Sequence, residues 1–229
     1  MAAAARKTNW FAIWVTVAVA VVLIGVAALV VWMNDSSSNA GPTVVPDAPS
    51  INVETGAIEV GDGTGTMDTY IDFMCPICNQ FEQAYGEAIT GLVDDGTITL
   101  NIHPISILDR LSQGTQYSTR AANAMYCVAA AAPEASVPFM QAMFANQPDE
   151  GTSGLTNEQI LQVAALVDVT GIDACVNDVE YSDFVATMTD KTPVAPGADG
   201  IGTPTIAING AVISNSSLPE PANLASLFE

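Results

Sequence analysis

The sequence predicts an α/β fold, in which strands and helices alternate along the chain after residue 50. Residues 66–74, "TMDTYIDFM", and 97–105, "TITLNIHPI", have the alternating pattern of strands, and a helical pattern at 79–96 separates them. A helical block at about 112–190 follows, and the chain then returns to a strand, a turn and a strand at 202–214.

The individual elements are indicated by local spacing. Residues 51–63, "INVETGAIEVGDG", are typical of a short β-hairpin that ends in a Gly-rich turn. The helix at 79–96 is apolar on one face and stops at Gly96. Within the helical block, Thr156 and Gln159 form a capping-box pattern. The pair Asn209-Gly210 suits a tight hairpin turn, and residues 219–229 favour a short closing helix.

The N-terminal region predicts one transmembrane helix. Residues 10–33 carry no charge and would extend about 36 Å as a helix, against a hydrocarbon core of about 30 Å. Arg6 and Lys7 precede this segment, so residues 1–9 are expected in the cytosol and the rest outside the cell membrane. A cleaved signal peptide, with "SNA" at 38–40 as its site, is the alternative. Residues 34–50 have the composition of a flexible linker, and residues 51–229 form the predicted domain.

The predicted exported part is strongly acidic. All 25 acids follow residue 33, whereas Arg110, Arg120 and Lys191 are its only bases, which gives a formal charge of −22. A surface of this charge repels phosphate backbones, so nucleic acid is excluded as a partner.

Two cysteines carry the clearest chemical signal. Cys75 and Cys78 form a CxxC motif between a strand and a helix, which is the arrangement of a thioredoxin-like redox site. Cys75 falls at the predicted helix start, where unpaired N–H groups and the helix dipole favour a thiolate, and Pro76 suits the first helical turn. Cys78 lies one turn further, where it is expected to be more buried and to attack a mixed disulfide formed at Cys75.

The chain has two further cysteines, Cys127 and Cys175, and four cysteines allow three pairings. If Cys75 pairs with Cys78, Cys127 and Cys175 remain for each other as a structural disulfide within the helical block. A zinc site of four thiolates is the rival interpretation. It is disfavoured because Cys127 and Cys175 form no close pair and the only histidine, His103, lies in an alternating strand. No metal is therefore expected.

"CPICNQFE" at 75–82, together with "GIGTPTIAING" at 200–210, resembles the DsbA-like thiol:disulfide oxidoreductases, particularly the membrane-anchored members of actinobacteria. The resemblance covers roughly residues 51–229. It implies a thioredoxin fold with an inserted helical domain, and a loop in which Pro204 is a cis-proline preceded by Thr203 and faces the CxxC motif. By the same resemblance, Glu82 tunes proton transfer near the site; a solvated glutamate on the helix face is the alternative.

The sequence also departs from the family pattern. Strongly oxidising members carry Pro-His between the cysteines, whereas this chain has Pro-Ile, and Thr69 stands where some members have an acid. The resemblance implies a dithiol oxidase for secreted proteins with reduced cysteines, with no cofactor besides the Cys75–Cys78 couple. A quinone-linked membrane protein of the DsbB or VKOR type would reoxidise it. The alternatives are a disulfide isomerase or reductase of the same fold, and a non-enzymatic acidic binding module in which the CxxC motif is a staple.

Overall fold

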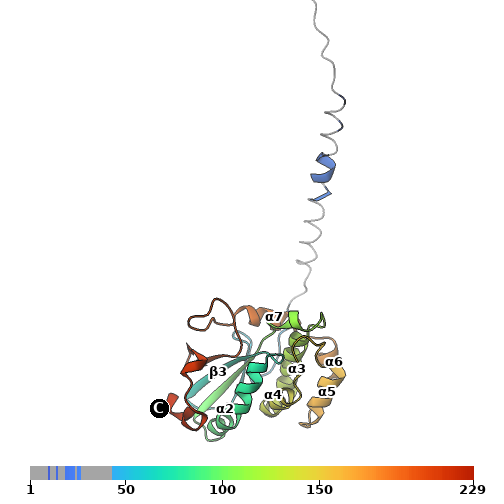
Figure 1. The fold of residues 1–229 in the computed structure, drawn as a ribbon. Coiled ribbons are helices and arrows are strands. Elements are labelled where there is room, and N and C mark those ends of the chain that lie inside the picture. The colour runs from blue at the N-terminus through green and yellow to red at the C-terminus, as the bar shows by residue number, and fades with distance from the viewer. Residues whose placement is uncertain (1–9, 11–13, 15–18, 24, 27–42) are drawn as a thin grey trace, which may run out of the picture. The chain divides into compact units, whose positions relative to one another are not determined.

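The fold comes from a computed structural model of the 229-residue chain, which describes residues 10, 14, 19–23, 25–26 and 43–229 (Figure 1). The chain divides into two units, Met1–Thr43 and Val44–Glu229. Those residues of the first unit that are described before residue 43 are helical and exposed. No helix in the described part of the chain is both long and apolar enough to cross a bilayer. Most of the predicted anchor at 10–33, all of residues 1–9 and residues 34–42 of the predicted linker lie outside the described residues.

The second unit is built on a six-stranded mixed sheet with the order β1-β2-β4-β3-β5-β6. Its strands are β1 (Ile51–Asn52), β2 (Ala57–Val60), β3 (Gly65–Ile71), β4 (Ile98–Pro104), β5 (Thr205–Ile208) and β6 (Ala211–Ile213). The two central strands, β3 and β4, are parallel, and every other pair is antiparallel. A parallel pair needs a crossover, which here is α2 (Pro76–Asp94). The alternation of strands and helices predicted from the sequence is confirmed.

Both predicted hairpins are present. β1 pairs with β2, and β5 pairs with β6 through a turn at Asn209 and Gly210, whose φ angles are 49° and 78°. Positive φ at both central residues is what the type I′ hairpin turn requires, and asparagine and glycine adopt it most readily.

The helical insertion separates β4 from β5 (Figure 1). It contains α3 (Tyr117–Ala131), α4 (Ser136–Ala145), α5 (Asn157–Ala165), α6 (Asp173–Asn177) and α7 (Ser182–Asp190), with short 3-10 helices η1 (Asp109–Leu111) and η2 (Pro133–Ala135). The predicted capping box forms at the start of α5, where Thr156 Oγ1 accepts from Gln159 N–H and Gln159 Oε1 accepts from Thr156 N–H. A disulfide joins Cys127 on α3 to Cys175 on α6.

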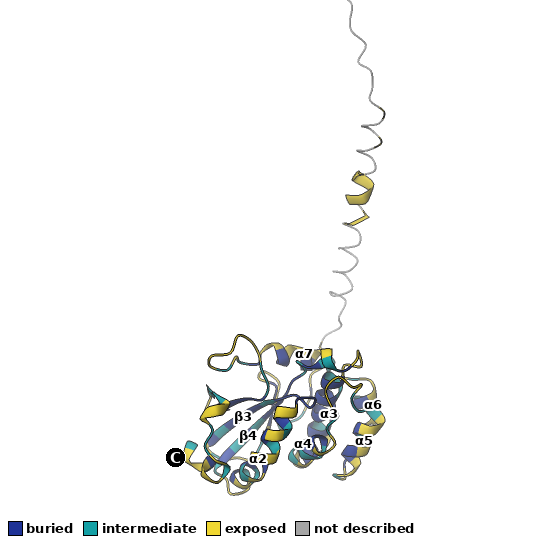
Figure 2. Ribbon diagram, viewed as in Figure 1, coloured by how far each residue is buried: buried dark blue, intermediate teal, exposed yellow. Residues whose placement is uncertain are grey.

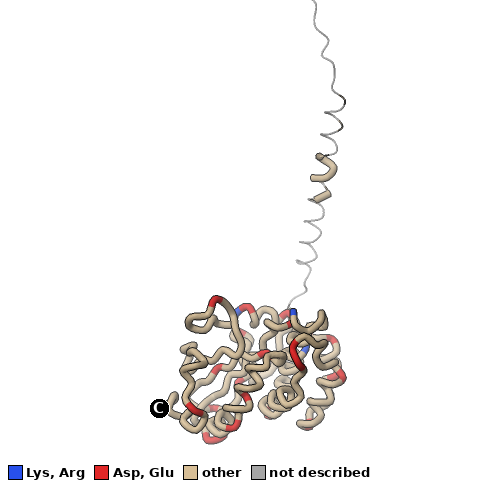
Figure 3. Tube along the Cα trace, viewed as in Figure 1, with Lys and Arg blue, Asp and Glu red and all other residues tan. Residues whose placement is uncertain are grey.

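Packing joins the insertion to the sheet. Figure 2 shows buried residues along β3, β4 and α3. On the side of the sheet that carries Thr69 and Ile71, α2 and α4 lie against β3 and β4. The chain closes with the short 3-10 helices η3 (Asn215–Ser217) and η4 (Pro221–Leu227), and η4 packs against α2. Acidic residues are spread over the domain surface, with few bases among them (Figure 3).

Candidate active site

Cys75 is the residue that caps the N-terminus of α2. Pro76 occupies the first helical position, and Cys75 N–H donates to the carbonyl of Asp72 at 2.9 Å. Cys75 keeps 5 % of its residue surface exposed. A hydrogen bond from the Cys78 thiol lowers the pKa of Cys75, helped by the backbone N–H groups of Cys78 and Ile77, whereas burial and the charge of Asp72 act to raise it. The net direction is downward, as expected for a thiol at a helix N-terminus.

Cys78 differs from Cys75 in its surroundings. It lies in the first turn of α2 with no exposed surface, and burial raises its pKa well above the ordinary value. Both thiols are free in this structure, so it represents the reduced couple. The two thiols therefore differ: Cys75, which keeps a little exposed surface, favours the thiolate, and the fully buried Cys78 keeps its proton.

The loop that begins β5 faces both sulfurs. The Thr203–Pro204 peptide bond is cis. The Cys75 thiol donates to the carbonyl of Thr203 at 3.5 Å, and Cys78 Sγ lies 2.9 Å from Thr203 Oγ1. These contacts place Thr203 and Pro204 opposite the CxxC motif, where the resemblance predicted them.

The Thr203 hydroxyl has further partners. It donates to the carbonyl of Tyr70 at 3.1 Å, and it accepts from the N–H of Asp72 at 3.2 Å. A hydroxyl has one hydrogen and two lone pairs. In one arrangement, the hydroxyl donates to the Tyr70 carbonyl and accepts a hydrogen bond from the Cys78 thiol. In the other, the Cys78 thiol donates to the Cys75 thiolate, and the hydroxyl turns its hydrogen to the Cys78 sulfur. Thr203 thus supports the reduced couple in both arrangements.

Asp72 is a buried acid that sequence reasoning missed. It has no exposed surface, and its carboxylate accepts from the N–H groups of Met74 and Leu108, each at 2.9 Å. Burial is the main reason that its pKa is raised from 3.8 to about 6. The only sequence signal was an acid within the otherwise apolar end of a strand, just before the CxxC motif. Its bonds tie the segment before Cys75 to the segment after β4.

Gln147 connects the helical insertion to the active-site segment. Its Nε2 donates to the carbonyl of Phe73 at 3.0 Å and to that of Cys75 at 2.9 Å. Its Oε1 accepts from Asn79 Nδ2 at 3.0 Å, and the same amide donates to the carbonyl of Phe144 on α4. No local pattern in the sequence marks Gln147, because its partners lie about 70 residues away.

Glu82 lies one turn after Cys78 on α2. Its carboxylate is half-buried rather than solvated, and Gln141 Nε2 on α4 donates to its Oε1 at 3.1 Å. Burial raises the pKa of Glu82. A cavity of about 10 Å³ lies between α2, α4, β3 and β4. Its walls are mostly apolar side chains, and its polar lining residues are Glu82, Cys78, Thr69 and Thr90. This volume is about the minimum for one water molecule.

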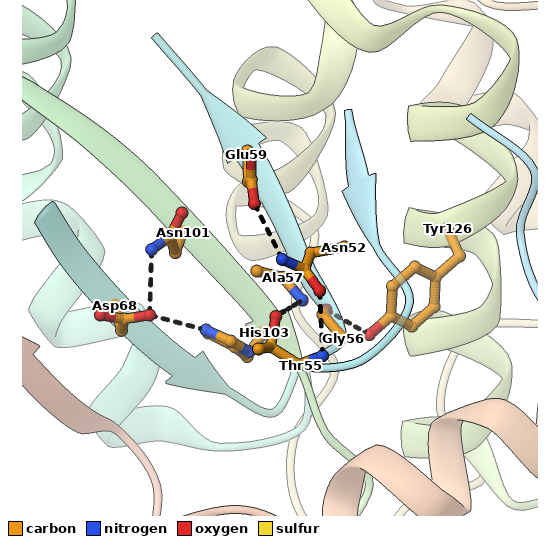
Figure 4. Close-up of polar contacts among 9 residues, drawn as sticks. All are labelled: Asn52, Thr55, Gly56, Ala57, Glu59, Asp68, Asn101, His103 and Tyr126. Atoms are coloured by element: carbon orange, nitrogen blue, oxygen red, sulfur yellow. Dashed lines mark hydrogen bonds and ion pairs between the residues drawn. The ribbon is translucent and has the colours of Figure 1, made fainter. Parts of the chain in front are cut away.

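A second polar cluster lies on the opposite face of the sheet (Figure 4). Asp68 Oδ1 accepts from Asn101 Nδ2 at 3.1 Å and lies 3.0 Å from His103 Nε2. The His103 ring is buried and stacks on Tyr70 with 4.0 Å between the ring centres. Asp68 and Tyr70 alternate with Thr69 and Ile71, so they point away from α2 and from the cavity beside Cys78. His103 is a packed strand residue and does not reach the sulfurs.

The described residues contain no cluster of three or more metal-ligating side chains. Only two of the four cysteines are thiols in this structure, because Cys127 and Cys175 are bonded to each other, so a zinc site of four thiolates is not formed. Within that part of the chain, the chemistry that the geometry offers is that of a dithiol.

Comparison with known proteins gives the same class. Residues 61–224 match the family model described as Thioredoxin. The structure is similar to the reduced disulfide bond oxidoreductase DsbG of Mycobacterium tuberculosis, with a TM-score of 0.65 and 29 % identity, covering 75 % of this chain and 85 % of that one. It is also similar to reduced DsbA of Mycobacterium tuberculosis, with a TM-score of 0.60 and 30 % identity, covering 68 % and 83 %.

Among curated sequences, the serine/threonine-protein kinase PknE of Mycobacterium tuberculosis is 29 % identical over 215 residues, covering 90 % of this chain. The chain spans 38 % of the length of that protein. A dithiol at a helix N-terminus, opposite a cis-proline on a mixed sheet, defines the thiol:disulfide oxidoreductase class. The chain belongs to the thioredoxin family, and its structure is similar to those of DsbA-like thiol:disulfide oxidoreductases.

Proposed function

We propose that the chain is an extracytoplasmic dithiol oxidase that introduces disulfide bonds into secreted proteins. The observation that carries this proposal is the different placement of the two thiols: Cys75 stands at the N-terminus of α2, opposite the cis peptide bond of Thr203–Pro204, whereas Cys78 is fully buried behind it. This placement lowers the pKa of Cys75 and raises that of Cys78. An interaction that stabilises the Cys75 thiolate stabilises the reduced enzyme, which makes the Cys75–Cys78 disulfide a better oxidant. It also makes Cys75 the better leaving group.

The reaction runs in two exchanges. A substrate thiolate attacks Cys75 Sγ of the oxidised enzyme, which forms a mixed disulfide and transfers the electron pair of the broken bond to Cys78 Sγ. Cys78 takes up a proton, as its raised pKa requires. A second thiolate of the substrate then attacks the substrate sulfur of the mixed disulfide and displaces Cys75 as a thiolate. The substrate leaves with a disulfide and the enzyme is left with two reduced cysteines.

Thr203, Pro204 and Glu82 have supporting roles in this proposal. Thr203 and Pro204 face Cys75, so a substrate chain bound there lies beside the reactive sulfur. Thr203 also stabilises the reduced Cys78. Glu82 exchanges a proton with Cys78 across the cavity that both residues line. Cys127–Cys175 is a structural disulfide, and the reaction needs no further cofactor.

The place of the enzyme in the cell is proposed from its sequence. The uncharged segment 10–33, with Arg6 and Lys7 before it, anchors the chain in the membrane as a single span with the domain outside. Unfolded secreted proteins with reduced cysteines are the substrates, and a quinone-linked DsbB- or VKOR-type protein restores the disulfide. Protease treatment of intact cells should remove the domain and leave residues 1–9 protected; protection of the domain would exclude this topology.

The test of the oxidase proposal is oxidation of a reduced model protein by the full chain. The Cys75→Ser and Cys78→Ser variants should both lose this activity, because neither can form the disulfide that accepts the electrons of the substrate. Full activity without Cys75 would refute the assignment. In the reduced enzyme, iodoacetamide should label Cys75 first, because Cys78 is fully buried.

Isomerisation or reduction is the second candidate function, since this chain has Pro-Ile between its cysteines, where strongly oxidising members of the family have Pro-His. The equilibrium potential against glutathione separates the two directions. A value near that of DsbA, about −120 mV, supports the oxidase, whereas a value near that of thioredoxin, about −270 mV, supports a reductant.

A further inference from the structure

Gly86 stands in the middle of α2, where glycine is costly. In the middle of a helix, glycine destabilises by roughly 0.5–1 kcal/mol relative to alanine. Gly86 is buried, ten residues after the start of a helix of 19 residues, and its backbone has no positive φ that would require glycine. Neither a turn nor a helix end accounts for it, so the space that a side chain would occupy is the feature to consider.

That space is filled by the carboxylate of Glu82. A Cβ atom built on Gly86 would overlap Glu82 Oε1 and lie 2.8 Å from Glu82 Cδ. Residues four apart in a helix lie on the same face, so Cys78, Glu82 and Gly86 form one stripe along α2. All three line the same cavity of about 10 Å³. The Glu82 side chain therefore folds back over Gly86 instead of extending to solvent.

A second contact holds the carboxylate from the other side. Gln141 on α4 donates to Glu82 Oε1, the same oxygen that occupies the space over Gly86. Among the residues that line the cavity, Cys78 and Glu82 are the two that titrate; β3 contributes Thr69 and Ile71, and α4 contributes apolar side chains. Gln141 thus holds the carboxylate at a small cavity in which Cys78 is the other titratable lining residue.

We propose that Gly86 is a positioning residue: by lacking a side chain, it lets the Glu82 carboxylate lie in the cavity shared with Cys78, where the two exchange a proton. This inference rests on the proposed role of Glu82. When a substrate thiolate opens the Cys75–Cys78 bond, the electron pair passes to Cys78 Sγ, and the proton passes from the Glu82 carboxyl to that sulfur through one water. During reoxidation the proton returns to Glu82 as Cys78 attacks the mixed disulfide.

The chain offers a matched control for this test. Gly91 lies on the same helix, but a Cβ atom there would meet nothing within 4 Å. Gly86→Ala and Gly91→Ala therefore add the same methyl group to the same helix, and both should keep or raise the melting temperature. Only Gly86→Ala should displace the Glu82 carboxylate, because only its methyl group would meet that carboxylate. The carboxylate can move aside, because it is the far end of a flexible side chain.

The experiment measures the rate at which a small thiol opens the disulfide of the full-length enzyme, by acid quenching and mass spectrometry across a pH series. Glu82→Gln should slow this step, by at least about tenfold if Glu82 acts as a general acid. Gly86→Ala should match Glu82→Gln in rate and pH profile, the double variant should be no slower, and Gly91→Ala should equal the wild type. Carbon NMR of Glu82 should also find its raised pKa restored toward the ordinary value in Gly86→Ala only.

The outcomes separate two failures. If Glu82→Gln slows the step but Gly86→Ala leaves both the rate and the Glu82 titration unchanged, the positioning role of Gly86 is overturned while the role of Glu82 stands. If Glu82→Gln itself has the wild-type rate and pH profile, the proposed proton exchange fails, and the inference about Gly86 fails with it.

Discussion

The side chain of Gln147 donates a hydrogen bond to the backbone carbonyl of Cys75 at 2.9 Å, so a residue of the helical insertion directly holds the segment that carries the reactive sulfur. The same Nε2 holds the carbonyl of the fully buried Phe73. The insertion is therefore part of the active-site framework as well as a covering domain.

Replacing Gln147 by alanine should destabilise the reduced enzyme by about 1–3 kcal/mol, because two carbonyls in a part-buried region lose their donor. Urea unfolding of the reduced protein measures this effect. Asn146→Ala is the neighbouring control: the Asn146 amide is exposed and donates only to Ala142 within the end of its own helix, so its loss should cost less than about 0.5 kcal/mol. Equal unfolding midpoints for the two variants would contradict the structural role of Gln147.

The sequence predicted what depends on local spacing. The capping box at Thr156 and Gln159 and the turn at Asn209 and Gly210 both involve residues within three positions of each other, and both formed as expected. The position of Cys75 at the start of a helix was readable for the same reason, since Pro76 and the apolar spacing after it mark the helix start.

The remainder of the site depends on tertiary packing. Gln147 and Gln141 reach α2 from an insertion some 60–70 residues away, and no periodicity indicates which of its polar residues turn inward. Asp72 was hidden within an apolar run, because the sequence shows a carboxylate but not the two N–H groups that make its burial possible. The pairing of Asp68 with His103 likewise follows from the register of β3 on β4.

Thr203→Val should make the enzyme a weaker oxidant. The hydroxyl pairs with Cys78 Sγ at 2.9 Å in the reduced enzyme, and a disulfide sulfur is a poorer partner, so its removal destabilises mainly the reduced state. A loss of about 1 kcal/mol corresponds to a potential about 20 mV lower. Equilibration with glutathione measures the potential. Thr203→Ser keeps the hydroxyl and should stay near the wild type, whereas a valine variant with an unchanged or higher potential would rule out this role.

Removing the second disulfide should affect stability and leave the chemistry intact. Cys127 and Cys175 are separated by 48 residues, and closing a loop of that length stabilises by up to about 4 kcal/mol through the unfolded chain. The double variant Cys127→Ala with Cys175→Ala should therefore melt at a lower temperature. Below its melting transition it should oxidise a model substrate at the wild-type rate, because neither residue touches Cys75, Cys78 or Thr203. A loss of activity in the folded variant would show that the disulfide also shapes the redox site.

Asp72 should give the folded domain a distinct pH dependence. Burial raises the pKa of Asp72 from 3.8 to about 6, so the folded chain binds its proton more tightly than the unfolded chain does. The resulting stability is fully present below about pH 4 and is lost as the pH rises through about 6. A shift of this size corresponds to about 3 kcal/mol. Wild-type stability should therefore fall, relative to that of Asp72→Asn, by up to this amount between pH 4 and 7.

The comparison is made by urea unfolding at each pH, with Cys75 and Cys78 replaced by serine in both proteins so that thiol titration does not contribute. Asparagine keeps an acceptor for the N–H of Met74 but turns a donor toward that of Leu108, which adds a penalty that does not vary with pH. That constant offset leaves the slope of the difference as the measured quantity. Parallel stability curves for the two proteins would mean that Asp72 titrates alike in the folded and unfolded chains, in which case its burial has no electrostatic cost.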